Sequence, residues 1–346
     1  MKRFLAAVLV LMVCASFLFS LETRRGQVRI LLDEDKGTFS IYHSSRGEEE
    51  KSFFVSQDPR TTGITLLVNN RLFRMGQNST FRQEAVLTDS GCAYVWTSPS
   101  LKAVLDFVFV SSDGSSYSDG VRLLLSLENL SRNSQNVGVR FLFDTWLGET
   151  GRYHFTLSDQ SAVEGEKEIS GGFPDYWTSG DAGASTRLQV MLKGKGTTPP
   201  ARVIFANWKR LNETSWNYDT HSSRNFNFLP YSINDSAVAQ YYDIQALEPA
   251  ASIEISILLG LFSDRGFTEI TPAAAALAAE PVVPVEPGNE ETLLEAVRVD
   301  LTQVNKVLQQ IEAALSSGEE LDQATLNSLK DSVMELEERR SRYQTE

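Results

Sequence analysis

Hydrophobic and polar residues alternate with a period of two through most of the chain between residues 27 and 262. This alternation predicts β-strands, because successive side chains of a strand point to opposite faces of its sheet. The strand-like runs recur roughly every ten residues and are separated by Gly, Asn, Asp and Ser, without helical spacing between them. The pattern therefore predicts an all-β fold built as a large antiparallel β-sandwich.

Three pairs of runs are joined by short segments of turn-forming residues, which predicts hairpins, and a fourth pair flanks the Ser/Gly/Asp-rich residues 111–120. The paired runs are residues 28–32 with 38–43, 65–68 with 72–74, 85–88 with 93–97, and 101–110 with 121–127. Further strand-like runs follow at residues 188–192, 202–206, 238–246 and 253–261. Together these runs predict a β domain that spans residues 21–265.

One run, residues 137–143, is apolar on one face at every position and has Leu142 as an apolar exception on the other. We expect a central strand whose second face is also partly covered. Directly after this strand come Asp144, Trp146 and Glu149, so a carboxylate, a large aromatic ring and a second carboxylate meet at a strand end. Binding loops commonly have this composition.

The period changes after the β region. Residues 266–289 hold Pro272, Pro281, Pro284 and Pro287 around an alanine-rich piece, which predicts a semi-rigid linker. In residues 290–346 the apolar positions are spaced by three or four residues and are interrupted at Ser316-Ser317-Gly318. This rhythm predicts a coiled-coil-like helical hairpin, and its narrow apolar seam favours self-association or a protein partner.

The first twenty residues have the composition of an export signal. A basic start at Lys2 and Arg3 precedes an apolar run that is short for a membrane anchor. We expect a mature protein in the periplasm or cell envelope. Cys14 raises the alternative of a lipoprotein, which the bulky Val13 before it disfavours. With Cys14 removed, Cys92 is the only remaining cysteine, and an internal disulfide is excluded.

The charge of the chain is acidic and uneven. The formal net charge is −13, of which −8 falls on residues 286–346. A nucleic-acid-binding protein needs a basic face, so this class is excluded. Beyond residue 20 we find no run long and apolar enough to span a membrane.

The sequence contains no motif that names a reaction. The three histidines, His43, His154 and His221, form no HExxH motif or close His/Cys cluster, and no GxSxG or Walker-type glycine loop is present. We therefore predict neither a metal nor another cofactor. Asp144, Glu149 and His154 are candidates for an acid–base group at one sheet end. The alternative is a solvated loop with a partly buried histidine.

A second candidate site is rich in tryptophan. Flat apolar rings with carboxylates and amides nearby in sequence are the mixture that sugar sites use, although tryptophan in a large β domain is also a common core residue. The complete set of candidate ligand-binding residues is Asp144, Trp146, Glu149, His154, Asp175, Trp177, Trp208, Trp216 and His221, with Asp181 also near in sequence.

The run VRFLFDTWLGE, residues 139–149, resembles a strand-and-loop segment of secreted bacterial β-sandwich domains related to the galactose-mutarotase-like supersandwich. The resemblance implies a supersandwich-like fold. It also implies a paired histidine and carboxylate, for which only His154 or His221 with an Asp or Glu can stand in.

Two hypotheses for function follow. In the first, the protein is a non-enzymatic interaction or structural protein of the envelope, with the sandwich as binding head and the hairpin as assembly element. In the second, it binds or modifies carbohydrate, as an epimerase does, through the Trp-rich face. The isolated β domain binds glycans only under the second hypothesis.

Overall fold

The computed structural model describes residues 20–44, 49–112, 115, 117–180, 186–264, 267 and 271–272. The chain divides into two compact units, residues 1–278 and 279–346, and the described residues belong to the first. The predicted export signal apart from its last residue, most of the predicted linker and the whole predicted helical hairpin lie outside the described residues. Within the described part, no helix combines the length and hydrophobicity needed to cross a bilayer.

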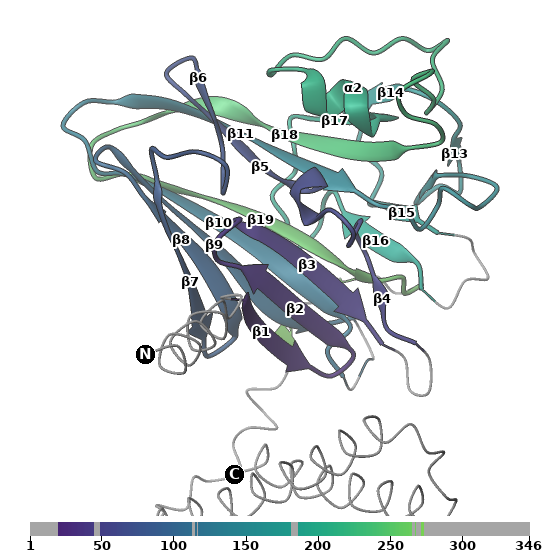
Figure 1. The fold of residues 1–346 in the computed structure, drawn as a ribbon, viewed down its shortest axis with the longest axis horizontal. Helices are drawn as coiled ribbons and strands as arrows, with labels where there is room; N and C mark the ends of the chain where they lie inside the picture. The colour runs from purple at the N-terminus through teal and green to yellow at the C-terminus, as the bar shows by residue number, and fades with distance from the viewer. Residues whose placement is uncertain are drawn as a thin grey trace, which may run out of the picture. The chain divides into compact units, whose positions relative to one another are not determined.

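The described chain is all-β and antiparallel, as the alternation predicts (Figure 1). A four-stranded sheet has the order β1 (Ser20–Arg25), β2 (Val28–Asp33), β3 (Thr38–His43) and β4 (Lys51–Ser52). A six-stranded sheet has the order β14 (Lys167–Ile169), β17 (Arg202–Asn207), β18 (Ser236–Leu247), β11 (Gln135–Asp144), β5 (Gly63–Val68) and β6 (Arg71–Arg74).

A ten-stranded sheet is the largest layer. Its order is β13 (Ala162–Val163), β12 (Phe155–Leu157), β15 (Tyr176–Ser179), β16 (Leu188–Met191), β19 (Ser252–Leu261), β10 (Gly120–Asn129), β9 (Leu101–Ser111), β8 (Gly91–Thr97) and β7 (Arg82–Thr88), and β20 (Thr271–Pro272) also pairs with β9. The described residues contain one short α-helix, α2 (Trp208–Glu213), and one 3₁₀ turn, η1 (Pro59–Thr61).

The three hairpins predicted from turn chemistry are confirmed as β2–β3, β5–β6 and β7–β8, and the two runs that flank residues 111–120 pair as β9 and β10. The β5–β6 turn shows the reason clearly, because Asn69 and Asn70 have φ angles of 47° and 66°. Asparagine tolerates this left-handed region better than most other residues. Turn residues thus fix the local pairing, while the order of distant strands depends on the core.

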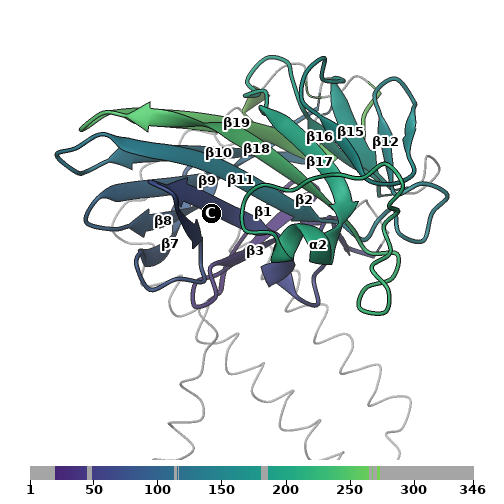
Figure 2. The same ribbon diagram turned by 90° about the horizontal axis from the view of Figure 1, so that it is seen from above.

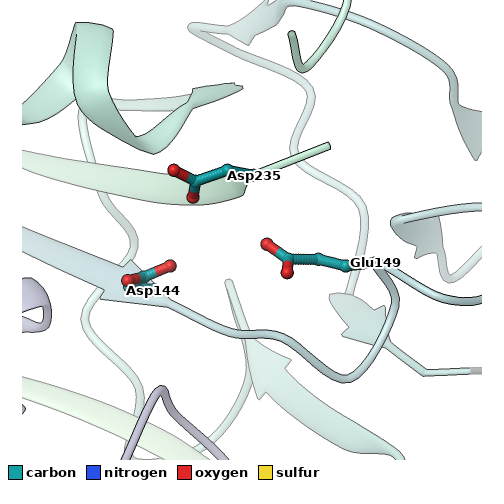
Figure 3. A group of neighbouring side chains, drawn as sticks. All are labelled: Asp144, Glu149 and Asp235. Atoms are coloured by element: carbon teal, nitrogen blue, oxygen red, sulfur yellow. The ribbon is translucent and has the colours of Figure 1, made fainter. Parts of the chain in front are cut away.

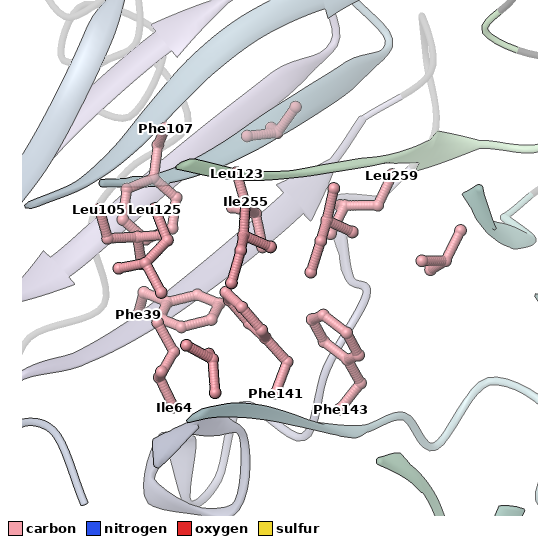
Figure 4. Close-up of a cluster of buried hydrophobic side chains, with 14 of the residues drawn as sticks. Phe39, Ile64, Leu105, Phe107, Leu123, Leu125, Phe141, Phe143, Ile255 and Leu259 are labelled. Carbon is pink, nitrogen blue, oxygen red and sulfur yellow. The ribbon is translucent and has the colours of Figure 1, made fainter. Parts of the chain in front are cut away.

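The main core lies between the ten-stranded and six-stranded sheets (Figure 4). Phe107, Leu123 and Leu259 come from the large sheet and face Phe141 and Phe143 of β11. All five side chains are fully buried. Since each side chain of this size contributes about 1.5–3 kcal/mol on burial, this layer supplies much of the driving force for folding.

The four-stranded sheet packs beside the same core. Phe39 of β3 meets Phe107 of β9 at a ring-centroid distance of 5.0 Å. The Tyr94 hydroxyl of β8 donates to the backbone oxygens of Asp33 and Thr38, at 2.8 and 2.7 Å. Strand ends from the first third of the chain are therefore fixed to the large sheet.

Strand β11 is central in the six-stranded sheet, between β18 and β5, and both of its faces are covered. The second face is covered by α2, which packs against β11, β17 and β18 (Figure 2). Leu142 joins Leu211 of α2 and Tyr218 in a small separate cluster. This explains the apolar exception in the sequence and confirms the expected central strand.

Candidate functional site

The antiparallel register of β11 and β18 brings two distant acidic residues to the same sheet edge. Asp144 is the last residue of β11 and lies opposite Ala237, near the start of β18. Asp235 directly precedes the first residue of β18. Because the end of one antiparallel strand meets the beginning of its neighbour, Asp144 and Asp235 become neighbours.

The loop after β11 adds a third carboxylate. The Glu149 backbone N–H donates to the Trp146 oxygen at 3.1 Å, which closes a turn. Glu149 Oε1 then accepts from the backbone N–H of Ser236 at 2.9 Å. Gly148 allows this path, because a Cβ at its position would lie 2.1 Å from the backbone oxygen of His154. No other residue type fits this close approach.

The side chains of Asp144, Glu149 and Asp235 converge on one space (Figure 3). One oxygen of each carboxyl group lies within 4.8 Å of those of the other two. Asp144 is 3% exposed, and the other two are half-buried. None of the ion pairs found among the described residues involves any of the three. We call this group the acidic cluster.

Asp144 is held firmly by its backbone. Its N–H donates to Thr62 Oγ1 at 3.0 Å, and its backbone oxygen accepts from the Val55 N–H at 3.0 Å. Its side-chain oxygen Oδ1, however, is buried and has no hydrogen-bond partner in the described part of the chain. A buried polar atom without a partner is costly and therefore informative.

Asp235 sits on a loop fixed by a buried amide. Asn207, at the end of β17, donates through Nδ2 to the backbone oxygens of Phe226 and Asp235, both at 2.9 Å. Ser232 Oγ donates to Asp235 Oδ2 at 2.6 Å. The second oxygen of this carboxylate remains available to a ligand.

The pKa values of the cluster reflect its burial. Desolvation is the main cause that raises the pKa of Asp144 to about 8; a hydrogen bond from the Thr61 side chain opposes it, and the nearby charges of Asp235 and Glu149 add to it. Desolvation also raises the pKa of Glu149 to about 7 and that of Asp235 above its usual range. Carboxylates in this position need protons, hydrogen-bond donors or a cation around them.

His154 supports the cluster from outside. Its Nδ1 lies 2.7 Å from Ser236 Oγ and its Nε2 lies 2.9 Å from Asn234 Oδ1, while Asn234 Nδ2 donates to the backbone oxygen of Glu149. The imidazole stacks on Phe226 at 4.5 Å between ring centroids. Burial lowers its pKa, so the neutral ring is favoured and both nitrogens are occupied within the protein.

Trp146 is the aromatic residue of the same loop. Its indole N–H donates to the Ser52 backbone oxygen at 3.2 Å, and the residue is 37% exposed. Trp208 is half-buried and donates to the Thr61 backbone oxygen at 3.0 Å. Both rings are therefore fixed by their polar edge.

The other two candidate tryptophans pack against aromatic side chains of the protein. Trp177 is fully buried and contacts Phe143 and Phe155, with centroid distances of 6.4 and 5.7 Å, so it belongs to the core and presents no ring face at the surface. Trp216 is half-buried and packs edge-on against Tyr241 at 5.5 Å.

The remaining candidates lie elsewhere on the chain's surface. Asp175 is exposed and pairs with Lys193 at 3.0 Å. His221 is exposed, and its backbone N–H donates to Glu166. Asp181 lies outside the described residues.

Of the predicted candidates, the structure brings Asp144, Glu149 and His154 together at one sheet end. Asp235 was missed by sequence reasoning. It stands about ninety residues from Asp144 in the chain, and only the pairing of β11 with β18 joins them. An acid directly before a strand-like run was the one available signal.

Glu166 provides a contrast to the acidic cluster. Its side chain is fully buried, but Arg210 lies 2.7 Å from Oε1, Arg224 lies 3.8 Å from Oε2, and the Tyr218 hydroxyl donates to Oε1 at 2.6 Å. This protein therefore neutralises one buried carboxylate with arginine and leaves Asp144 without such a partner. The difference marks the acidic cluster as the better candidate for ligand binding.

Comparison with known proteins gives a resemblance in fold only. No family model and no curated protein matches the chain. A galactose mutarotase related enzyme from Lactobacillus acidophilus is similar in structure, with 9% identity, coverage of 73% of this chain and 100% of that chain, and a TM-score of 0.46. A 4-alpha-glucanotransferase from Thermococcus litoralis has 6% identity, coverage of 70% and 37%, and a TM-score of 0.39.

A galactose mutarotase-like protein from Clostridium acetobutylicum has 10% identity, coverage of 70% of this chain and 95% of that chain, and a TM-score of 0.38. The chain thus has a weak structural resemblance to galactose-mutarotase-like proteins, as the segment at the end of β11 indicates.

Proposed function

We propose that the protein binds a carbohydrate at the acidic cluster. The observation that carries this proposal is the convergence of three poorly solvated carboxyl groups that take part in none of the ion pairs found among the described residues. In its ionised form such a group offers many hydrogen-bond acceptors and lacks donors. A sugar supplies several hydroxyl donors in a small volume, and each hydrogen bond to a charged acceptor contributes about 1.5–3 kcal/mol.

Trp146 adds the apolar part of the proposed site. It lies two residues after Asp144 and is 37% exposed as a residue, while its indole N–H is anchored to Ser52. Sugar rings have an apolar face of C–H groups that packs on such a ring. Trp146→Ala should therefore weaken sugar binding with little loss of stability.

The test is a titration of neutral mono- and oligosaccharides against the full chain, followed by calorimetry. Glu149→Gln and Asp235→Asn should each weaken binding about ten- to a hundredfold. The matched control is Glu248→Gln, an exposed acid that follows the far end of β18, on the order of 40 Å along the strand. Absence of binding to any sugar, or equal weakening in the control, contradicts the proposal.

Chemical conversion of a bound sugar is tested separately from binding. Proton NMR of the same sugar mixtures follows the anomeric signals over time. Faster interconversion than in buffer would extend the proposal from binding to modification.

An exposed apolar loop beside the site favours a second candidate function, protein interaction. Leu229, Tyr231 and Ile233 are 68%, 70% and 67% exposed, and Asp235 follows them closely. Apolar side chains grouped in this way commonly mark contact surfaces. A Leu229→Ser, Ile233→Ser double variant should lose partners from an envelope extract while it melts like the wild type.

Both functions are proposed for an exported protein of the cell envelope. Fractionation of cells that express the full chain tests this, because the export signal predicts the mature protein outside the cytoplasm. Recovery with the cytoplasmic fraction alone would contradict it.

A further inference from the structure

We propose that the acidic cluster binds one divalent cation of the calcium type. The site consists of Asp144 at the end of β11, Glu149 in the following loop and Asp235 before β18. Cation binding is argued from the geometry of these three residues and does not depend on sugar binding. Only the further step, in which the same cation also binds sugar hydroxyls, rests on the proposed function.

Asp144 has a buried carboxylate oxygen without a hydrogen-bond partner among the described residues. Oδ1 is buried without a hydrogen bond in the described part of the chain, although the residue is 3% exposed and its carboxyl group faces the other two acids (Figure 3). Hydrogen bonds at both its N–H and its backbone oxygen hold the backbone of Asp144 in place, so the side chain cannot turn easily toward water. A metal ion gives this atom a partner and removes the cost of burying it alone.

The second argument is the oxygen spacing. One oxygen from each of the three residues lies within 4.8 Å of the others. Calcium takes oxygen ligands at about 2.3–2.6 Å, so oxygens on opposite sides of the ion lie up to about 4.6–5.2 Å apart. Magnesium, with ligands at about 2.0–2.1 Å, spans only about 4.0–4.2 Å. The spacing is therefore compatible with one calcium ion bound by an oxygen of each residue.

The third argument is the available donors. The internal hydrogen bonds of the site use Glu149 Oε1 and Asp235 Oδ2, which leaves the other oxygen of each carboxylate for a ligand. Both ring nitrogens of His154 are engaged by Ser236 and Asn234. The donor set is thus three hard oxygens, which suits calcium, magnesium or manganese and disfavours softer metals.

The fourth argument is charge. Buried Glu166 is neutralised by Arg210 and Arg224, whereas no ion pair of the described residues reaches the acidic cluster. A divalent cation would supply the positive charge that no ion pair of the described residues brings to these three acids. Three carboxylates fill about half of the six to eight positions of calcium, and water or sugar hydroxyls complete the rest.

The experiment is a titration of the chelator-treated full chain with calcium chloride, with magnesium chloride in parallel, by calorimetry and thermal denaturation. We expect one calcium per chain, weaker binding of magnesium, and a rise in Tm of about 5 °C or more at a hundredfold excess over Kd. Asp144→Asn, Glu149→Gln and Asp235→Asn should each weaken calcium binding at least tenfold, while Glu248→Gln binds as the wild type.

A second readout separates a cation site from a merely structural carboxylate. Asp144→Asn removes a buried acid that no ion pair of the described residues stabilises, so the cation-free variant should melt at or above the wild-type Tm while losing its response to calcium. A wild type that shows neither heat nor a Tm shift with calcium would overturn the inference. So would a calcium response unchanged by all three cluster variants.

Sugar titrations with calcium and with chelator keep the two proposals apart. Calcium binding without sugar binding supports the cation site and contradicts the proposed function. Sugar binding that is the same in chelator, together with no calcium binding, overturns the cation site and leaves the proposed function intact.

Discussion

At the scale of single residues, the partners of a buried carboxylate reveal its role better than its burial does. Glu166 and Asp144 are both withdrawn from water, but Glu166 has arginine, tyrosine and backbone partners, and Asp144 Oδ1 has none. The first arrangement is self-sufficient and structural. The second is complete only with a ligand.

Glu166→Gln should destabilise the fold because it leaves Arg210, whose side chain is only 16% exposed, without its counter-charge. Breaking a buried pair by removing one partner costs about 3–5 kcal/mol. Urea denaturation measures the change, with Glu168→Gln as the control, since Glu168 is exposed and its nearest cation is Arg202 at 3.9 Å. Similar decreases in the free energy of unfolding of both variants would show that the Glu166 network contributes no more to stability than an exposed ion pair.

Cys92 should be unreactive in the folded protein. The thiol is fully buried, and desolvation, followed by the charge of Asp106, raises its pKa to about 12. Thiolate is the reactive form, so alkylation at pH 8 should proceed only after unfolding in urea. Rapid labelling without denaturant would contradict this burial.

The same shift in the pKa of Cys92 means that, as pH rises from about 9 toward 12, the thiol of the unfolded chain ionises first and the stability of the fold falls.

At the scale of elements, the sequence predicted the features that depend on neighbouring residues, namely turns and single strands. Asparagine at positive φ fixed the β5–β6 turn, and alternation predicted β11 as a central strand. The short strands β12, β13 and β14 were not predicted, because two or three residues carry too little alternation. The pairing of β11 with β18 was not predicted either, because no local sequence pattern specifies which distant strands become neighbours. Two of the three carboxylates, Asp144 and Glu149, were predicted from one segment of sequence, whereas Asp235 could be found only from the fold.

Gly148→Ala should disrupt the site loop. The new Cβ would meet the His154 backbone oxygen at 2.1 Å, so the loop must move and carry Glu149 with it. We expect a loss of about 1–3 kcal/mol in stability and loss of ligand binding at the acidic cluster. Gly171→Ala is the matched control, because a Cβ at Gly171 would meet nothing within 4 Å. Equal effects of the two changes in urea denaturation and calcium titration would contradict the role of Gly148.

At the scale of the whole molecule, the end of the β domain lies beyond its last long strand. Phe267 is 1% exposed and packs with Val110 and Leu258, and β20 pairs with β9. The chain should therefore be cut after residue 278, where the first compact unit ends. The helical hairpin predicted for residues 290–346 and its role in assembly stay predictions from the sequence.

A chain that ends at residue 278 should melt cooperatively and be more stable than one that ends at residue 264. Loss of a buried phenylalanine alone costs about 3–5 kcal/mol. Calorimetric melting of the two truncated chains, beside the full chain, measures the difference. Equal stability of both would show that Phe267 and β20 contribute little.

The most direct measurement is the location of a bound ion in a crystal of the full chain soaked with terbium chloride, which substitutes for calcium and scatters anomalously. The account predicts one strong anomalous peak within about 2.3–2.6 Å of oxygens from Asp144, Glu149 and Asp235. Well-ordered carboxylates at these positions without a peak between them, or with their oxygens turned apart, would contradict it.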